Sequence, residues 1–179
     1  MPNLRRHQML LRLVPVPVED LVVLALSQTP MKLSLRSLED SMPPRFVAER
    51  SLDHLRIGKP DFWCVPFYML RIPDEVLIGS CGFKDVPKSG RIEIGYGVSP
   101  KARNQGFATA AVAELLRIAL STDEVFQVLA QVNPDNVASI RVVQRLGFLP
   151  NGRQLDHDGE MLVQWLYESA GQHFLQHGS

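Results

Sequence analysis

Residues 91–120 change from the pattern of a β-strand to that of an α-helix across one short turn. Residues 91–98 are rich in β-branched and aromatic side chains, and they contain two glycines that would let a linear ligand lie close to the backbone. Residues 109–120 are dominated by Ala, Leu and Val at helical spacing. Between them lies Gly106, a residue type that permits a close turn before a helix. The segment predicts a strand–turn–helix unit of an α/β protein.

The rest of the chain predicts more strands and helices around this unit. Strand patterns occur at residues 9–14, 62–71, 76–83, 125–132 and 160–167, and helix patterns at residues 18–26, 43–57 and 137–146. Residues 29–40 fit either a strand or a loop. Three consecutive strands with short turns favour an antiparallel meander. We therefore expect one mixed α/β domain over residues 1–170, with helices on the faces of its sheet, and a polar, frayed tail at residues 171–179.

Composition limits the possible functions. The 179 residues are 45% hydrophobic and 21% charged, as in a globular protein with a real core. The 19 basic residues balance 19 acidic ones, so no overall field favours nucleic acid or an anionic membrane. The two cysteines, Cys64 and Cys81, suit neither a disulfide framework nor a zinc site, and we expect two reduced thiols and no metal. The N-terminal apolar run lacks the features of a signal peptide, and a cytoplasmic location is expected.

The turn at residues 103–108 has the features of a phosphate-binding site. A pyrophosphate needs several backbone N–H donors in one place, and a helix N-terminus supplies them with a favourable dipole. Gly106 allows the close turn, and Arg103 adds a positive charge. Ala108 has a small side chain at the second position where the ligand would come close to the backbone. Neither a Walker A loop nor the three-glycine dinucleotide fingerprint is present. The turn alone predicts an anion site, and a nucleotide-binding protein is one alternative.

Two segments resemble the GNAT superfamily of acetyltransferases. Residues 92–98, followed by Pro100 and residues 103–108, are similar to motif A, whose pattern is Gln/Arg-x-x-Gly-x-Gly/Ala. Residues 133–148 resemble motif B, in a form closest to the RimJ/RimL branch of ribosomal-protein N-terminal acetyltransferases. Residues 77–83 also resemble that branch, and the likeness covers residues 9–167.

This resemblance implies a GNAT-like mixed, mostly antiparallel sheet that splays between its fourth and fifth strands, with helices on both faces. Acetyl-CoA, as a co-substrate, would lie in the resulting cleft. Residues 92–98 would bind the pantetheine arm through their backbone, and Asn133 and Asn136 would contact the arm from the other side. The residues implied in acetyl-CoA binding are Ile94, Gly95, Tyr96, Val98, Arg103, Asn104, Gln105, Gly106, Phe107, Ala108, Thr109, Asn133, Asn136 and Ser139.

Direct acetyl transfer requires a neutral amine, a polarised thioester carbonyl and a proton for the departing thiolate. Many superfamily members have a Tyr where this chain has Val143, which cannot donate a proton. Ser139 lies one helical turn earlier, and we expect it to donate the proton or to hydrogen-bond the thiolate. The alternative is a serine that only bonds to backbone. Glu93 is the expected general base or amine-positioning group, with a structural carboxylate as the alternative.

The sequence therefore predicts an N-acetyltransferase that uses acetyl-CoA and a primary amine, from a protein N-terminus or a small molecule. A non-catalytic acyl-CoA-binding or regulatory module is the alternative, because Val143 replaces the usual acid. No nucleic-acid or membrane partner is expected, and the chain would be a monomer or homodimer. Of the remaining candidates, His54 is expected to be solvated, with a position facing the substrate as the alternative. Phe62 and Trp63 are expected in the core, with the alternative that one of them lines the acceptor pocket. His157 is expected in a turn, and His173 and His177 in the tail.

Overall fold

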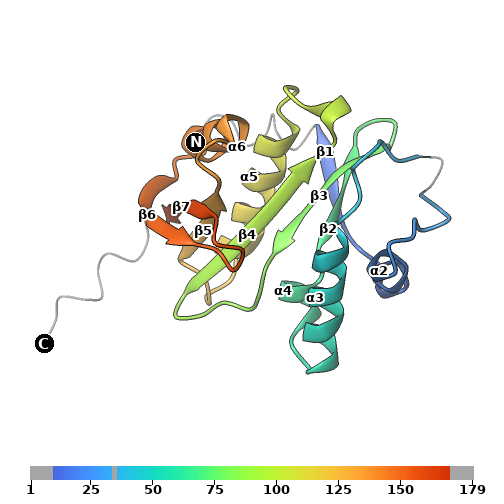
Figure 1. The fold of residues 1–179 in the computed structure, drawn as a ribbon, viewed down its shortest axis with the longest axis horizontal. Coiled ribbons are helices and arrows are strands. Elements are labelled where there is room, and N and C mark those ends of the chain that lie inside the picture. The colour runs from blue at the N-terminus through green and yellow to red at the C-terminus, as the bar shows by residue number, and fades with distance from the viewer. Residues whose placement is uncertain (1–9, 34–35, 170–179) are drawn as a thin grey trace, which may run out of the picture.

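The computed structural model describes residues 10–33 and 36–169, and these form a seven-stranded sheet with helices on both faces (Figure 1). The strand order is β1-β2-β3-β4-β5-β7-β6. All neighbouring strands are antiparallel except β4 and β5, which run parallel. The mixed, mostly antiparallel sheet predicted from the sequence is confirmed. The strands are β1 (Leu11–Pro15), β2 (Phe67–Arg71), β3 (Leu77–Phe83), β4 (Arg91–Val98), β5 (Gln127–Val132), β6 (Leu149–Leu155) and β7 (Met161–Glu168).

Alternation along the strands creates two hydrophobic cores, one on each face of the sheet. Met69 and Ile78 contribute to the larger core, which also takes in α5, whereas Tyr68 and Leu77 contribute to a smaller core beneath α2 and α3. Neighbouring residues of one strand, such as Tyr68 and Met69, thus point to opposite faces of the sheet. The helices are α2 (Val18–Ala25), α3 (Arg45–Arg56), α4 (Asp61–Cys64), α5 (Phe107–Leu120) and α6 (Val137–Arg145), with a short 3-10 helix, η1 (Pro100–Ala102).

Strand β4 separates an apolar face from a polar one. Ile92 and Ile94 are almost fully buried in the core that includes α5. Glu93 lies on the opposite face, as the two-residue repeat of a strand requires. The side chain of Lys84 passes over Gly95 on this polar face, since a β-carbon at Gly95 would lie 3.6 Å from the Lys84 Cε. On its polar face, β4 therefore carries charged groups next to the backbone of Gly95, which has no side chain of its own to cover it.

The parallel strands β4 and β5 separate before either of them ends. Their register runs from Arg91 opposite Gln127 to Ile94 opposite Ala130, and the pairing stops there. Beyond that point β5 stays paired with β7, and β4 stays paired with β3. The predicted splay between the fourth and fifth strands is confirmed, and it opens a cleft between their carboxyl halves.

Several predicted boundaries are wrong. Residues 62–71 do not form one strand, because Asp61–Cys64 is a helical turn after Pro60 and β2 begins only at Phe67. Strand β6 was missed, since it is exposed throughout and interrupted by Pro150 and Gly152, so no alternation marks it. Helix α5 begins at Phe107, two residues before the predicted start.

Other predictions fall partly outside the described residues. The ambiguous stretch at residues 29–40 contains no helix or strand in its described part, only a single bridge from Ser37 to Leu77. Met9 of the predicted first strand, residues 34–35, and the predicted tail with His173 and His177 lie outside the described residues. Among residues 10–33 and 36–169, no helix has both the length and the apolar character needed to cross a bilayer.

Candidate active site

The turn at residues 103–108 has the backbone form expected of a phosphate cradle. Gly106 immediately precedes α5 and has φ +84°, in the left-handed region that glycine favours. The N–H groups in the first turn of any helix lack intrahelical acceptors, and no side chain caps the start of α5, so these groups can bind a ligand. A β-carbon at Gly106 would come no closer than 3.8 Å to any other group, there to Leu10 Cδ1. The approach to the helix start is therefore open.

The side chains of this turn divide into buried and exposed groups. Phe107 and Thr109 are buried beneath α5, so each can offer a phosphate only its backbone N–H. Arg103, Asn104 and Gln105 are exposed. Arg103 forms no ion pair within the described part of the chain, which leaves its guanidinium available to an anionic ligand.

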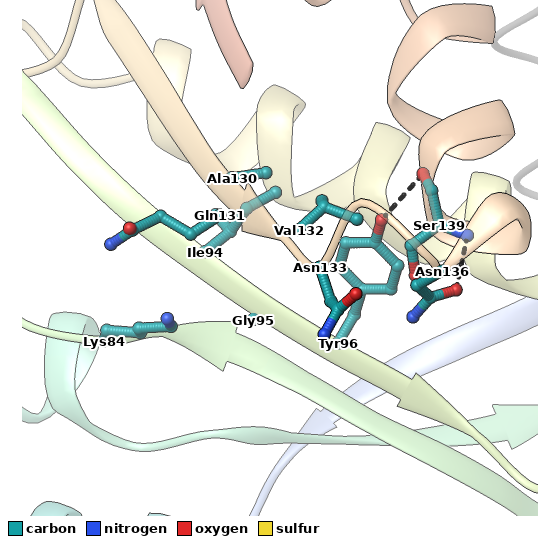
Figure 2. A pocket seen from close by; sticks show the side chains of 10 residues that line it. All are labelled: Lys84, Ile94, Gly95, Tyr96, Ala130, Gln131, Val132, Asn133, Asn136 and Ser139. Atoms are coloured by element: carbon teal, nitrogen blue, oxygen red, sulfur yellow. Dashed lines mark hydrogen bonds between the residues drawn. The ribbon is translucent and has the colours of Figure 1, made fainter. Parts of the chain in front are cut away.

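A pocket occupies the splay between β4 and β5 (Figure 2). It brings together six of the residues predicted from the sequence, which come from β4, the end of β5 and the start of α6, and adds four that sequence reasoning missed. Lys84 and Gln131 lie toward one end of it, and Asn136 and Ser139 toward the other. Val98, also predicted, ends β4 and packs partly buried against the core. The lining residues are Lys84, Ile94, Gly95, Tyr96, Ala130, Gln131, Val132, Asn133, Asn136 and Ser139.

The backbone of Ser139 is held from two sides. Its N–H donates to Asn136 Oδ1 at 3.0 Å, which makes Asn136 the N-cap of α6. Its carbonyl oxygen accepts a hydrogen bond from the Tyr96 hydroxyl at 3.3 Å. Burial raises the pKa of Tyr96, so the phenol stays protonated at neutral pH. The Ser139 hydroxyl has no hydrogen-bond partner among the described residues, and the alternative of a purely backbone-bonded serine gains no support from these contacts.

Asn133 is held by its own turn. Its Oδ1 accepts from the N–H of Asp135 at 2.8 Å, and its Nδ2 donates to Glu160 Oε2 at 3.5 Å. The first bond is an Asx turn, which fixes the side chain at the carboxyl end of β5. Asn133 thus contributes to the pocket wall with one of the two lone pairs of Oδ1 already used.

The carboxylate of Glu93 lies on the polar face of β4, next to the pocket. Its Oε1 accepts hydrogen bonds from the Lys84 ammonium and, at 3.1 Å, from Gln131 Nε2. Both donors line the pocket. Oε2 accepts no hydrogen bond from any described residue, so one oxygen of this partly buried carboxylate is free to accept from a ligand or water.

The family follows from a comparison with known proteins. Residues 11–149 match the family model for the acetyltransferase (GNAT) domain. This chain belongs to the GNAT family. The family suggested by its sequence motifs is confirmed, and GNAT enzymes use acetyl-CoA as a co-substrate.

Curated relatives of this GNAT chain are also named N-acetyltransferases. YjdG of Bacillus subtilis (strain 168) is 30% identical over 92 residues, which cover 51% of this chain and 52% of that protein. The p20 protein of Bacillus licheniformis is 35% identical over 86 residues, covering 48% of each. The chain matches about half the length of these relatives.

Solved structures share the fold of this GNAT domain over most of its length. Ribosomal-protein-S5-alanine acetyltransferase from Vibrio fischeri has a TM-score of 0.64 at 13% identity, over 90% of this chain and 94% of that one. Mycobacterium smegmatis RimJ, in complex with CoA-disulfide, has a TM-score of 0.60 at 18% identity over 89% and 86%. Spermidine N-acetyltransferase from Vibrio cholerae has a TM-score of 0.63 at 14% identity over 88% and 93%. At these identities the likeness concerns the fold.

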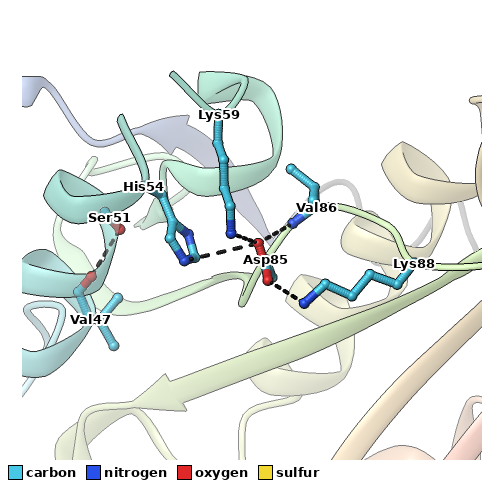
Figure 3. Close-up of polar contacts among 7 residues, drawn as sticks. All are labelled: Val47, Ser51, His54, Lys59, Asp85, Val86 and Lys88. Atoms are coloured by element: carbon cyan, nitrogen blue, oxygen red, sulfur yellow. Dashed lines mark hydrogen bonds and ion pairs between the residues drawn. The ribbon is translucent and has the colours of Figure 1, made fainter. Parts of the chain in front are cut away.

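A second group of charged residues lies under α3, beside the β3–β4 turn of the GNAT domain (Figure 3). The Asp85 carboxylate accepts hydrogen bonds from the Lys59 ammonium, from Lys88 at 2.8 Å and from the N–H of Val86 at 2.8 Å. Partial burial raises the pKa of Asp85, but these three hydrogen bonds outweigh it and hold the pKa well below its usual range. Asp85 therefore stays ionised and neutralised by lysines.

His54 belongs to the same group, and its predicted solvation is wrong. Its side chain is only 16% exposed, with Nε2 at 3.9 Å from Asp85 Oδ1. Burial, and then the nearby Lys59 charge, lower the pKa of His54. The imidazole is consequently neutral at neutral pH. The prediction failed because the sequence alone does not reveal which segment packs against the inner face of α3.

The remaining candidates have structural surroundings. Cys81 is buried, and burial raises the pKa of its thiol, as expected of an inert structural cysteine. Val143 is fully buried in the core, so it supplies only packing. Trp63 is buried as predicted, but Phe62 is 48% exposed and lies outside the core. His157 lies in the turn between β6 and β7.

Proposed function

We propose that this GNAT protein transfers the acetyl group of acetyl-CoA to a primary amine by direct attack, without a covalent enzyme intermediate. The observation that carries the proposal is the cleft between β4 and β5, which holds a free hydroxyl and unpaired strand backbone and has a free carboxylate oxygen beside it. These are the groups that a direct acyl transfer to an amine needs.

The residues present fit acetyl-CoA. The first-turn N–H groups of α5 and the exposed Arg103 form a site for a pyrophosphate, and Gly106 leaves the approach open. The edge of β4 that faces β5 has no partner strand beyond Ile94, so residues 95–98 can bind the amide groups of a linear arm. Asn104, Gln105 and Ala108 belong to the same cradle, and Asn133 and Asn136 to the opposite wall. When bound, acetyl-CoA would supply the activated acyl group.

The catalytic roles are assigned to Glu93 and Ser139. Glu93 Oε2 is proposed to accept a hydrogen bond from the acceptor amine, directly or through water, and to take up its proton. The Ser139 hydroxyl is proposed to donate to the thiolate that leaves. Its fixed backbone orients this hydroxyl without using it. Val143, buried one turn away, cannot replace it.

The acceptor is proposed to be a protein N-terminus or a small amine. Neighbours with the same fold are named as acetyltransferases of a ribosomal protein and of spermidine, which fits this range. The non-catalytic acyl-CoA-binding module stays the second candidate, because Val143 stands where many GNAT members have a Tyr acid. A cytoplasmic location and a monomeric or homodimeric state also stay predictions.

An acceptor screen with detection of the released thiol tests the proposal. The panel contains peptides with different first residues, amino acids and polyamines, and acetyl-CoA binding is measured in parallel by thermal shift against ATP. We expect stabilisation by acetyl-CoA and not by ATP, with thiol release on at least one amine. Binding without turnover on any amine would favour the module, and stabilisation by ATP alone would contradict the GNAT cofactor site.

A further inference from the structure

Arg50, on α3, is partly buried, and its guanidinium has no ion-pair partner among the described residues. It lies one helical turn before His54, whose Nε2 is 3.9 Å from Asp85 Oδ1, so Arg50 is on the face of α3 that covers the Asp85 group. Glu93 and Asp85 are the carboxylates whose charges act on it. Its surroundings contrast with the other two arginines of the same helix. Arg45 pairs with Glu49 at 2.7 Å, and Arg56 pairs with Asp53 at 2.9 Å, both at the surface. The one arginine of α3 turned toward the sheet is therefore the one without an ion pair.

A half-buried cation without a partner is costly. Desolvation disfavours the charged guanidinium, and burial lowers the pKa of Arg50. The cost is recovered when a carboxylate binds, because the planar fork of a guanidinium matches a carboxylate with two parallel hydrogen bonds. An unpaired guanidinium of this kind is suited to binding an anionic ligand, and it adds no stability to the fold by itself.

The carboxylates near Arg50 are already engaged by lysines. Lys84 donates to Glu93, and Lys59 and Lys88 both donate to Asp85. The group thus combines four cations, from one arginine and three lysines, with two carboxylates. A neutral imidazole at His54 does not change this balance. Both carboxylates are thus already paired with lysines, and Arg50 is the cation of this group that is left to bind an acid.

This group adjoins the proposed reaction site. Glu93, to which the acceptor amine is assigned, is one of the carboxylates that act on Arg50, and it accepts hydrogen bonds from two pocket residues, Lys84 and Gln131. Lys84 passes over Gly95 on the same face of β4. Resting on the proposed acetyl transfer, we infer that the acceptor carries a carboxylate close to its reacting amine and that Arg50 binds this carboxylate. Both the α-carboxylate of a free amino acid and an acidic side chain near a peptide N-terminus offer that chemistry.

Matched acceptors test the inference. Glutamate and its α-amide distinguish an α-carboxylate, peptides that begin Ala-Asp and Ala-Asn distinguish an acidic side chain, and spermidine represents polyamines. The kcat/KM for thiol release is measured for the wild type, Arg50→Met and the surface control Arg45→Met. We expect the wild type to prefer the acid of at least one pair, and Arg50→Met to lose about 10- to 100-fold on that acid only. Arg45→Met should match the wild type.

Two further readouts keep the outcome clear. Acetyl-CoA affinity should be unchanged in Arg50→Met, and its unfolding midpoint should be no lower than that of the wild type, because the variant removes an unpaired half-buried cation. On the acid acceptor, Arg50→Lys should be intermediate because it keeps the charge and loses the fork. A wild type that prefers the amides or spermidine would overturn the inference alone, as would an Arg50→Met loss equal for acid and amide. Absence of turnover on every acceptor would overturn the proposed function and this inference with it. If Arg50→Met does not fold, the acid preference of the wild type and the Arg50→Lys result decide.

Discussion

The hydroxyl of Tyr96, on β4, donates a hydrogen bond to the carbonyl oxygen of Ser139, on α6, over 3.3 Å. The two residues lie on opposite sides of the cleft, at the point where β4 and β5 no longer pair. The bond therefore joins the two walls that strand pairing leaves separate. It also fixes the peptide of the proposed acid, while the hydroxyl of Ser139 stays free.

Replacing Tyr96 with Phe removes this link. We expect the free energy of unfolding to fall by about 1 kcal/mol, the usual net value of one hydrogen bond, and acetyl-CoA affinity to fall with it. Urea unfolding and calorimetry measure the two effects. Tyr167→Phe is the matched control, because the Tyr167 ring packs on Phe148 and its hydroxyl has no hydrogen-bond partner among the described residues. If the two variants have the same free energy of unfolding and the same acetyl-CoA affinity, the hydrogen bond between Tyr96 and Ser139 has no functional role.

Replacing Ser139 with Ala tests the proposed acid separately from its scaffold. We expect kcat to fall by about 100-fold, within the range of general acid–base effects, with the unfolding free energy unchanged. Asn136→Ala is the structural counterpart, since it removes the N-cap of α6 and should cost about 1 kcal/mol of stability. Asn136→Asp keeps a capping oxygen and should restore stability. A Ser139→Ala enzyme with wild-type kcat would exclude the acid role.

Local patterns in the sequence were enough to predict the core of the GNAT domain. The two-residue repeat of a strand requires Glu93 to face away from Ile92 and Ile94, and the structure has this arrangement. The glycine turn and the Ala-rich helix after it were recognised because their geometry depends on neighbouring residues alone. Motif spacing then correctly predicted the splay, since it reflects a family whose fold is known.

Contacts between distant segments could not be predicted in this way. The Glu93 carboxylate is bound by Lys84, which directly follows β3, and by Gln131, on β5, and only the sheet order brings them together. The unpaired state of Arg50 likewise depends on what the inner face of α3 covers. Phe62 was misplaced because its aromatic neighbours favoured a strand, although Pro60 is typical of a helix start.

Replacing Glu93 with Gln tests the proposed base. We expect kcat to fall by about 100-fold or more, and the shape of the rate-against-pH profile to change, because an amide cannot take up a proton. The measurement is kcat/KM across the pH range with one good acceptor. Lys84→Met is a useful companion, since it removes a partner of the carboxylate without removing the carboxylate. An unchanged profile in Glu93→Gln would assign Glu93 a structural role.

The stability of the α3 region should depend on pH through Asp85. Hydrogen bonds from two lysines outweigh burial and hold the folded-state pKa of Asp85 below the ordinary value of 3.8. A carboxylate of this kind stabilises the fold above pH 3.8, and its contribution is lost as the pH falls below that value. Asp85→Asn should therefore lower the unfolding free energy at pH 7 by up to about 1 kcal/mol, with the difference shrinking below pH 3.8. Asp123→Asn, at the surface, should show no such dependence in urea unfolding.

The phosphate cradle is tested by Gly106→Trp. Gly106 and Gly147 both have positive φ, +84° and +88°, so a tryptophan at either position carries about 1 to 2 kcal/mol of backbone strain. A β-carbon would meet nothing within 4 Å at Gly147 and only Leu10 Cδ1, at 3.8 Å, at Gly106. Only Gly106 lies at the start of α5, where a large ring would cover the free N–H groups. We expect Gly106→Trp to weaken acetyl-CoA binding by at least about 100-fold, which corresponds to loss of the pyrophosphate contacts, while Gly147→Trp keeps wild-type affinity. Calorimetry on both folded variants decides, and intact affinity in Gly106→Trp would exclude this turn as the coenzyme A site.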